Sequence, residues 1–225
     1  MISKLPRWVE YGSLLLALIA GFVNSVGLLG FNHQSISHLS GTVTIIGTSL
    51  ADGNFINAFH LFMVLFSFLV GAAISGCFLR SGALRLGRNY GRLLTLEAMF
   101  LYASIYFLTQ DSLIGHYLAS SACGLQNALV STYSGAIIRT THVTGIFTDL
   151  GIMIGAKFRG EPFDKRKARL FLIIIIGFLL GGTIGAFFFS FLKFNALFIP
   201  ATTCLLLTLF YTLYNAKMAY TGKTD

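Results

Sequence analysis

Two similar heptapeptides carry the side chains best suited to chemistry in this sequence: HLSGTVT at residues 38–44 and HVTGIFT at residues 142–148. Each begins with a histidine, which can donate a hydrogen bond to a solute, relay a proton or respond to pH. Each also holds a glycine, Gly41 or Gly145, that suits a helix break, and hydroxyl groups that can cap a following helix. The same histidine can instead bond to a backbone carbonyl and fix a hairpin, and the Gly and Ser/Thr positions can simply let helices pack closely. The motif therefore predicts either a solute-binding site or a structural turn.

Two asparagines precede these motifs, each by roughly four helical turns. They are Asn24, before His38, and Asn127, before His142. A buried asparagine must find hydrogen-bond partners, so each can contact a solute or tie its own helix to the neighbouring motif. The candidate solute-binding residues are therefore Asn24, His38, Gly41, Thr44, Asn127, His142, Gly145 and Thr148.

Only the second motif has charged residues beside it, Arg139 and Asp149. Charges at membrane depth are costly and tend to pair. Asp149 can therefore bind a coupling proton or Na⁺, or form an ion pair with Arg139. If Arg139 lies at the cytoplasmic interface, it is a topology signal instead. We take Asp149 as the candidate coupling residue.

The composition places these motifs in a membrane protein. Of the 225 residues, 55% are hydrophobic and 11% are charged, whereas about a quarter of the residues in soluble domains are charged. Apolar segments long enough, or nearly so, to cross a bilayer lie at about 11–31, 59–79, 93–109, 113–138, 170–191 and 195–215. Two further segments, 36–51 and 142–156, are shorter and contain Gly, Ser and Thr. The sequence predicts an all-α integral membrane protein with a single domain over residues 1–225.

The basic residues predict the topology, because cytoplasmic loops are enriched in Lys and Arg. Most of them lie in the loops at 80–92 and 157–169, and others lie near both ends of the chain. All these clusters fall on the cytoplasmic side if the two short segments enter and return, or merely break a helix. We therefore expect six transmembrane helices, two short broken or re-entrant segments, and cytoplasmic N- and C-termini. Glu97, five residues after Arg92, is expected to neutralise the first loop.

The second half of the sequence repeats the first. Identical residues recur in the same order: Gly21 and Asn24 match Gly124 and Asn127 at an offset of 103; His38, Gly41, Thr44 and Gly47 match His142, Gly145, Thr148 and Gly151 at 104; Phe68, Leu69, Gly71 and Ile74 match Phe178, Leu179, Gly181 and Ile184 at 110. Each unit then holds three spans and one short segment. An odd number of crossings makes the copies face opposite ways, which predicts inverted-topology repeats at about 11–109 and 113–215.

Glycine spacing within the two long segments predicts close helix contacts. Gly177, Gly181 and Gly185 form two overlapping G-x-x-x-G steps, and Gly71 and Gly76 lie in the corresponding segment of the first half. Small residues at this spacing let two helices approach closely in a membrane.

The paired G-x-x-N and H-x-S/T-G-x-x-T elements resemble the YoaK-like family of bacterial membrane proteins. The resemblance is strongest for GLQNALVSTYSGAIIRTTHVTGIFTDLG at residues 124–151, and it covers essentially the whole chain. It implies a multi-pass protein of the bacterial inner membrane with several helices. The family brings no established activity, so the resemblance implies no site residue.

Two opposed half-helices would direct their positive N-terminal ends toward the membrane midplane. We therefore expect a secondary transporter or facilitator of a small polar or anionic solute. The alternatives are a non-transporting membrane scaffold or sensor, and an intramembrane hydrolase. The sequence lacks G-x-S-x-G, H-E-x-x-H and cofactor fingerprints, so we expect no enzyme activity, no cofactor and no metal.

The expected partners follow from the same features. They are a small-molecule solute, the lipid bilayer and a second copy of the chain, docked through an open hydrophobic face. Nucleic acid is not expected, because the basic loops lack interleaved aromatic residues.

Overall fold

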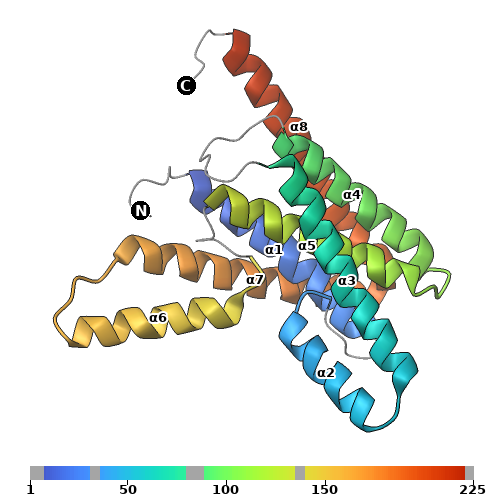
Figure 1. The fold of residues 1–225 in the computed structure, drawn as a ribbon. Helices are drawn as coiled ribbons and strands as arrows, with labels where there is room; N and C mark the ends of the chain where they lie inside the picture. The colour runs from blue at the N-terminus through green and yellow to red at the C-terminus, as the bar shows by residue number, and fades with distance from the viewer. Residues whose placement is uncertain (1–7, 31–35, 80–88, 135–139, 221–225) are drawn as a thin grey trace.

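The computed structural model describes residues 8–30, 36–79, 89–134 and 140–220. In these ranges the chain is helical and has no strand, which confirms the predicted all-α fold (Figure 1). The helices are α1 (Trp8–Gly30), α2 (Leu39–Ala51), α3 (Phe55–Phe78), α4 (Asn89–Leu108), α5 (Ile114–Ser134), α6 (Val143–Phe158), α7 (Lys165–Leu192) and α8 (Phe198–Tyr220), with a 3₁₀ turn, η2 (Lys193–Leu197), between the last two.

Several of these helices are long and apolar enough to cross a membrane. In the described ranges the stretches are Val9–Gly30, Phe55–Phe78, Asn89–Leu108 and Lys165–Tyr214, the last of which joins α7, η2 and α8. Large apolar side chains such as Phe62, Leu69 and Leu206 are exposed on the outside of the bundle. Exposed apolar side chains on long helices are what a lipid environment requires, so the chain has the fold of a helical membrane protein.

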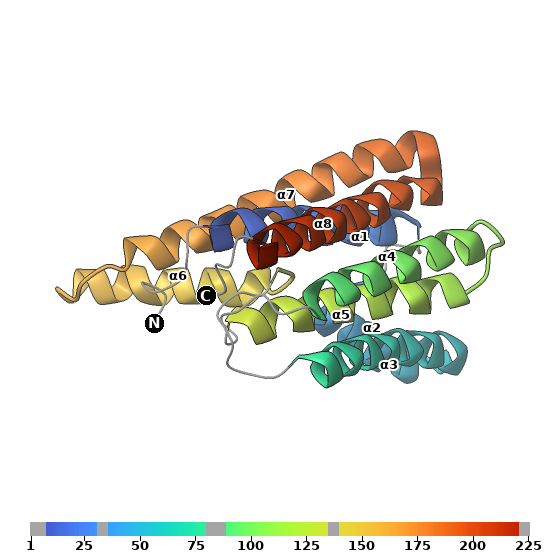
Figure 2. The same cartoon turned by 90° about the horizontal axis from the view of Figure 1, so that it is seen from above.

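The centre of the bundle consists of two pairs of helices that run in parallel, α1 with α7 and α3 with α5. Figure 2 shows α1, α4 and α7 running in one direction and α3, α5 and α8 in the other. The first helix of each half therefore packs against the third helix of the other half. α4 and α8, the last helices of the two halves, pack against each other in antiparallel fashion.

Glycines make the α1–α7 contact possible. A Cβ atom added to Gly21 would collide with the carbonyl oxygen of Phe178, and one added to Gly181 would collide with the carbonyl oxygen of Leu18. Added Cβ atoms at Gly177 and Gly185 would also be crowded by α1. The predicted close contact of the G-x-x-x-G steps is confirmed here.

The α3–α5 contact is built in the same way. An added Cβ at Gly124 would collide with the carbonyl oxygen of Phe68, and one at Gly71 with that of Ser121. Gly76 differs, because an added Cβ there has no atom within 4 Å. The expected helix contact therefore forms at Gly71 and not at Gly76.

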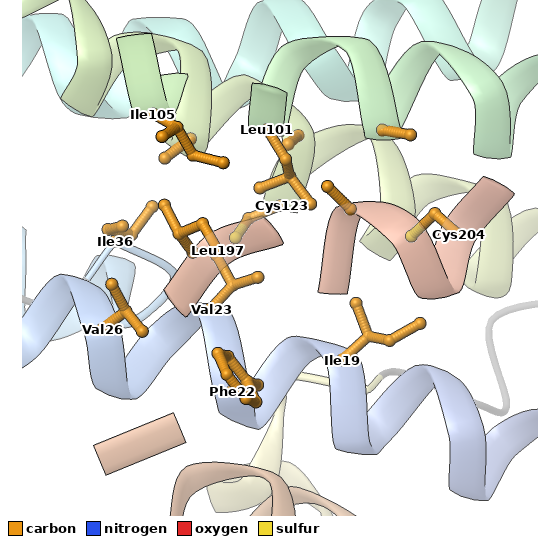
Figure 3. Close-up of a cluster of buried hydrophobic side chains, with 14 of the residues drawn as sticks. Ile19, Phe22, Val23, Val26, Ile36, Leu101, Ile105, Cys123, Leu197 and Cys204 are labelled. Atoms are coloured by element: carbon orange, nitrogen blue, oxygen red, sulfur yellow. The ribbon is translucent and has the colours of Figure 1, made fainter. Parts of the chain in front are cut away.

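Buried apolar side chains, among them residues of α1, α4, α5 and α8, fill the space between the pairs. Figure 3 shows Ile19 and Val23 of α1 facing Leu101 of α4, with Cys123 of α5 and Cys204 of α8 beside them. A second cluster lies nearer the start of α1 and includes residues of α5, α6 and α7. The first cluster is the apolar layer that separates α1 from α4.

The two short helices extend from the middle of the molecule in different directions (Figure 1). α2 folds back against α3 through the turn at Asp52–Asn54, and α6 folds back toward α7 through the turn at Arg159–Asp164. Among the described residues, α2 and α6 do not contact each other. Each motif is therefore held within its own hairpin.

The topology prediction rests partly on residues outside the described ranges. These are the basic N-terminus, most of the loop at 80–92, and Arg139. The number of crossings and the side on which the termini lie stay predictions.

Two glycines of α3 provide a test of the close helix contacts. We expect Gly71→Ala to destabilise the protein by roughly 1–3 kcal/mol, because its methyl group must displace the α5 backbone. The matched change Gly76→Ala, in the same helix, meets open space and should leave stability unchanged or slightly raised. Thermal unfolding of the detergent-purified variants measures both effects. Equal behaviour of the two variants would contradict the contact.

Candidate functional site

Asn24 lies in α1, about 9 Å along the helix before its end at Gly30. Its side-chain oxygen accepts hydrogen bonds from the hydroxyl of Ser37, at 2.8 Å, and from the backbone N–H of Ser37, at 3.3 Å. Ser37 is buried and directly precedes His38, the N-cap residue of α2. The chain that leaves α1 therefore returns to the level of Asn24 before α2 begins.

Asn127 has the same role in the second half. It lies in α5, and its side-chain oxygen accepts a hydrogen bond from the hydroxyl of Thr141 at 3.3 Å. Thr141 directly precedes His142, the N-cap residue of α6. Each candidate asparagine is thus hydrogen-bonded to the residue that precedes the histidine of its motif. Of the two roles that the sequence left open, this is the structural one, in which the asparagine ties its helix to the motif.

The two histidines have almost the same backbone geometry. His38 has φ −92° and ψ 69°, and His142 has φ −92° and ψ 56°. Their carbonyl oxygens accept hydrogen bonds from the backbone N–H groups of Thr42 and Ile146, both at 3.2 Å. Neither side chain caps its helix. The imidazoles are exposed at the positive ends of α2 and α6.

Gly41 and Gly145 act differently from the helix breaks that the sequence predicts. Both lie in the first turn of their helices, which begin at residues 39 and 143. A Cβ added to Gly41 would lie 2.8 Å from Nδ1 of His38, and one added to Gly145 would collide with the ring of His142. The break therefore precedes the glycine, and the missing side chain makes room for the imidazole.

Three threonine hydroxyls of the motifs bond within their own helices. Thr44 and Thr148 are exposed, and each donates its hydroxyl hydrogen to the carbonyl four residues earlier, that of Ser40 or Thr144, at 3.0 Å. Thr42 bonds to the carbonyl of His38 in the same manner, at 3.3 Å. A hydroxyl that donates to the carbonyl oxygen one turn earlier is satisfied within its own helix. These three hydroxyls therefore do not cap the helix ends.

Asp149 has a partner that the sequence did not indicate. Its carboxylate lies 3.4 Å from Nζ of Lys167 in α7, and its side chain is 46% exposed. This ion pair links α6 to α7. Arg139, the partner that the sequence suggested, lies outside the described residues. Near the same end, Glu10 of α1 pairs with Arg169 of α7 at 3.5 Å.

Sequence reasoning missed the environment of Glu97. The side chain does not reach the basic loop, since it is only 2% exposed and lies inside the bundle. The thiol of Cys204 hydrogen-bonds with the carboxyl group, and Oε2 has no hydrogen-bond partner among the described residues. The spacing of Leu93, Glu97 and Leu101 places them on one helix face, and this apolar face was the available signal.

The hollow described at one end of the bundle is separate from the motifs. It has a volume of about 450 Å³ and includes Gly30, Asp111 and Lys193 in its lining. Both charged residues have positive φ angles, 53° and 51°. None of the eight candidate solute-binding residues lines it. In the described ranges there is also no group of three or more His, Cys, Asp or Glu side chains able to hold a metal ion.

The hydrogen bond between Asn24 and Ser37 can be tested with a double-mutant cycle. Asn24→Ala leaves the hydroxyl and N–H of buried Ser37 without this acceptor, which should cost roughly 1–3 kcal/mol. The loss should be smaller in a Ser37→Ala background, so the two changes should not be additive. Thermal unfolding in detergent measures this, and Ser40→Ala, which removes an exposed hydroxyl, is the control that should be additive with Asn24→Ala. Additive effects for Asn24 and Ser37 would show that the bond does not stabilise the fold.

Comparison with known proteins gives one match. The model of a family described as "Protein of unknown function (DUF1275)" matches residues 12–210. No curated protein and no solved structure matches the chain. The match covers most of the chain and agrees with the resemblance to an uncharacterised membrane family, while the YoaK-like name itself stays a prediction.

Proposed function

The chain belongs to the DUF1275 family, and we propose that it is a secondary transporter or facilitator of a small polar or anionic solute. One observation carries the proposal. The N-termini of α2 and α6 have the same geometry, and each is held by an asparagine at a level inside the preceding helix. Paired helix ends at membrane depth are a feature of transporter binding sites.

The contacts between the long helices support an inverted-repeat architecture. Gly21 packs against the backbone of Phe178, and Gly124 packs against the backbone of Phe68. The offset of 103 relates Gly21 to Gly124, and the offset of 110 relates Phe68 to Phe178, so the two contacts are equivalent. The corresponding helices run in opposite directions, α1 against α5 and α3 against α7 (Figure 2). An antiparallel relation between equivalent helices is what an inverted repeat requires, and a parallel repeat would not produce it.

The lengths of the short helices support two re-entrant segments and six spans. α2 has 13 residues and α6 has 16, which correspond to about 20 Å and 24 Å of helix. The apolar core of a bilayer is about 30 Å thick. Each short helix therefore reaches only part of the way, and its N-terminus lies within the membrane if its turn lies at the surface.

The chemistry at these N-termini suits a solute with negative or polarised oxygen atoms. A helix N-terminus presents N–H groups and a partial positive charge. The exposed imidazoles of His38 and His142 add a hydrogen-bonding group at each end. Because Gly41 and Gly145 leave room for the rings, the imidazoles lie against the first turn. Asp149, the coupling candidate from the sequence, forms an ion pair with Lys167.

A specific feature favours the alternative, a non-transporting scaffold or sensor. Gly47 of α2 and Gly151 and Gly155 of α6 are small residues whose added Cβ atoms meet nothing within 4 Å. Open small-residue faces suit helix association in membranes. A partner, including a second copy of this chain, could dock there without any transport.

The inverted-repeat architecture predicts that the two hairpin turns lie on opposite sides of the membrane. Single cysteines at Asn54→Cys and Pro162→Cys, both exposed in the turns, should show this in a background without Cys77, Cys123 and Cys204. A membrane-impermeant maleimide should label Asn54→Cys in intact cells and Pro162→Cys only after permeabilisation. Labelling of both from one side would require a parallel repeat.

The transport proposal predicts that both histidines contribute to solute flux. A thermal-stability screen against small anions, amino acids, sugars, nucleobases and metal ions at two pH values first identifies a ligand, because ligands of the folded state raise stability. Flux of that ligand into proteoliposomes should fall by about 10-fold to 100-fold in the variant with His38→Ala and His142→Ala, the effect of losing a hydrogen bond to a charged group.

The control for this experiment is His60→Ala. His60 lies in α3, hydrogen-bonds with Tyr117 of α5 at 3.1 Å and is not part of either motif. Solute flux through the His60→Ala variant should therefore match that of the unchanged protein. Undiminished flux in a well-folded double-histidine variant would overturn the proposed site. No stabilising ligand and no flux of any compound would favour the scaffold or sensor.

A further inference from the structure

Glu97 is a carboxylic acid placed in the middle of a membrane-spanning helix. It lies in α4, on the face that also carries Leu93 and Leu101, and these two neighbours are 1% and 0% exposed. Its own exposure is 2%, and Oε2 has no hydrogen-bond partner within the described part of the chain. An ionisable side chain at such a position is rarely retained for packing alone.

The groups around Glu97 cannot neutralise a negative charge. Cys204 of α8 and Cys123 of α5 are the titratable groups that face it from the helices packed against α4. Both are thiols, which are weak donors, and in the described ranges no Lys, Arg or His forms an ion pair with Glu97. A carboxylate would lose its hydration there without gaining a counter-ion, so the neutral acid is the stable form in this conformation.

Polar side chains continue from Glu97 along the contact between α4 and α8 toward the start of α4. The hydroxyl of Thr95 lies 3.5 Å from that of Thr208, which is one turn of α8 beyond Cys204. Thr212, one turn further, is exposed and bonds to the carbonyl of Thr208 at 2.8 Å. These hydroxyls also donate to backbone carbonyls, that of Thr95 to Gly91 and that of Thr208 to Gly91 and Cys204. They are the polar side chains of the α4–α8 contact between the level of Glu97 and exposed Thr212.

A second polar pair lies on the other side of Glu97 along the same contact. The hydroxyls of Tyr102 and Thr202 are 2.9 Å apart, and Thr202 is exposed. We call the residues Thr95, Glu97, Tyr102, Thr202, Cys204, Thr208 and Thr212 the α4–α8 polar seam. Along the α4–α8 contact, Glu97 thus lies between the Tyr102–Thr202 pair and the Thr95–Thr208 pair. Exposed Thr202 and exposed Thr212 lie at different positions along α8.

Helix α5 connects the surroundings of Glu97 with the proposed solute site. Cys123, which faces Glu97, lies one helical turn before Asn127 on the same face of α5. Asn127 holds Thr141 and, through it, the start of α6. A shift of α5 on solute binding would therefore move one wall of the space around Glu97.

We propose that Glu97 is the proton-binding site of this protein and that the α4–α8 polar seam carries the proton to and from it. On release, the O–H bond of the acid breaks, the proton passes to a water molecule at the seam, and the resulting carboxylate accepts a hydrogen bond from the Cys204 thiol. The inference rests on the proposed transport function and specifies its coupling ion as H⁺. It makes Glu97, rather than Asp149, the residue that couples the two fluxes.

The proton site can be tested without knowledge of the solute. Infrared difference spectra of the full-length protein in proteoliposomes, recorded over a series of pH values, report protonated carboxyl groups through their C=O stretch. We expect a protonated carboxyl band that is lost as the pH rises, is absent in Glu97→Gln and has a shifted midpoint in Glu97→Asp. Glu10→Gln, which removes an ion-paired carboxylate, should leave the band unchanged.

Two spectroscopic results would overturn the inference. One is the absence of any band that depends on Glu97, and the other is a Glu97 band of constant intensity throughout the pH series. Because Glu97→Asp keeps a carboxyl group, its band still gives an answer if Glu97→Gln does not fold.

Flux measurements with the ligand from the stability screen separate this inference from the proposed function. We expect Glu97→Gln to lose solute uptake driven by a pH gradient while it keeps exchange of labelled for unlabelled solute, which a merely structural defect would not allow. If solute uptake driven by a pH gradient depends on both histidines but is unaffected by Glu97→Gln, the transport proposal would be supported and proton coupling through Glu97 would be overturned. A titrating Glu97 in a protein without flux would overturn the transport proposal and the coupling, and leave only proton binding.

Discussion

The hydrogen bond between an asparagine inside a long helix and the residue that precedes a short helix is the interaction on which the motif architecture depends. A chain that turns back within a bilayer must satisfy its backbone polar groups without water. Asn24 does this for Ser37, including its N–H group, and Asn127 binds Thr141 in the other half. These bonds fix the level along α1 and α5 at which α2 and α6 begin, and thereby the position of both histidines.

Glycine contacts hold the two halves together around these bonds. α1 packs on α7, and α3 packs on α5, so each half supplies one helix to each tight pair. Carbonyl oxygens lie where the Cβ atoms of Gly21, Gly71, Gly124 and Gly181 would be. Backbones at this distance gain dispersion contacts that larger residues would prevent. The halves interlock instead of lying side by side, and a movement in one half must therefore change a contact of the other.

The sequence predicted the helical class and the close glycine contacts at Gly71 and Gly181, because these follow from composition and local spacing. It left open whether each asparagine ties its helix to the neighbouring motif or contacts a solute. It gave the wrong reason for Gly41, whose neighbour His38 occupies the space above it only once the helix start is fixed. It also misplaced Glu97. Proximity to Arg92 in the sequence suggested a surface charge, whereas the burial of Glu97 depends on how α5 and α8 pack on α4, and spacing along one helix does not specify that packing.

The residues that recur in both halves have a different role from those that occur in only one half. Those that position the chain recur in both halves, whereas the charged groups do not: the offset of 104 relates Asp149 to Ile45, and the offset of 110 relates Glu97 to Leu207. A duplicated scaffold can alternate between two equivalent conformations, since each half can adopt the contacts of the other. A single buried acid adds a difference between those conformations, because its surroundings cannot be the same in both. Under the proposed transport function, this difference would let proton binding bias an otherwise balanced equilibrium, and one acid would suffice although the proposed solute-binding motif is paired.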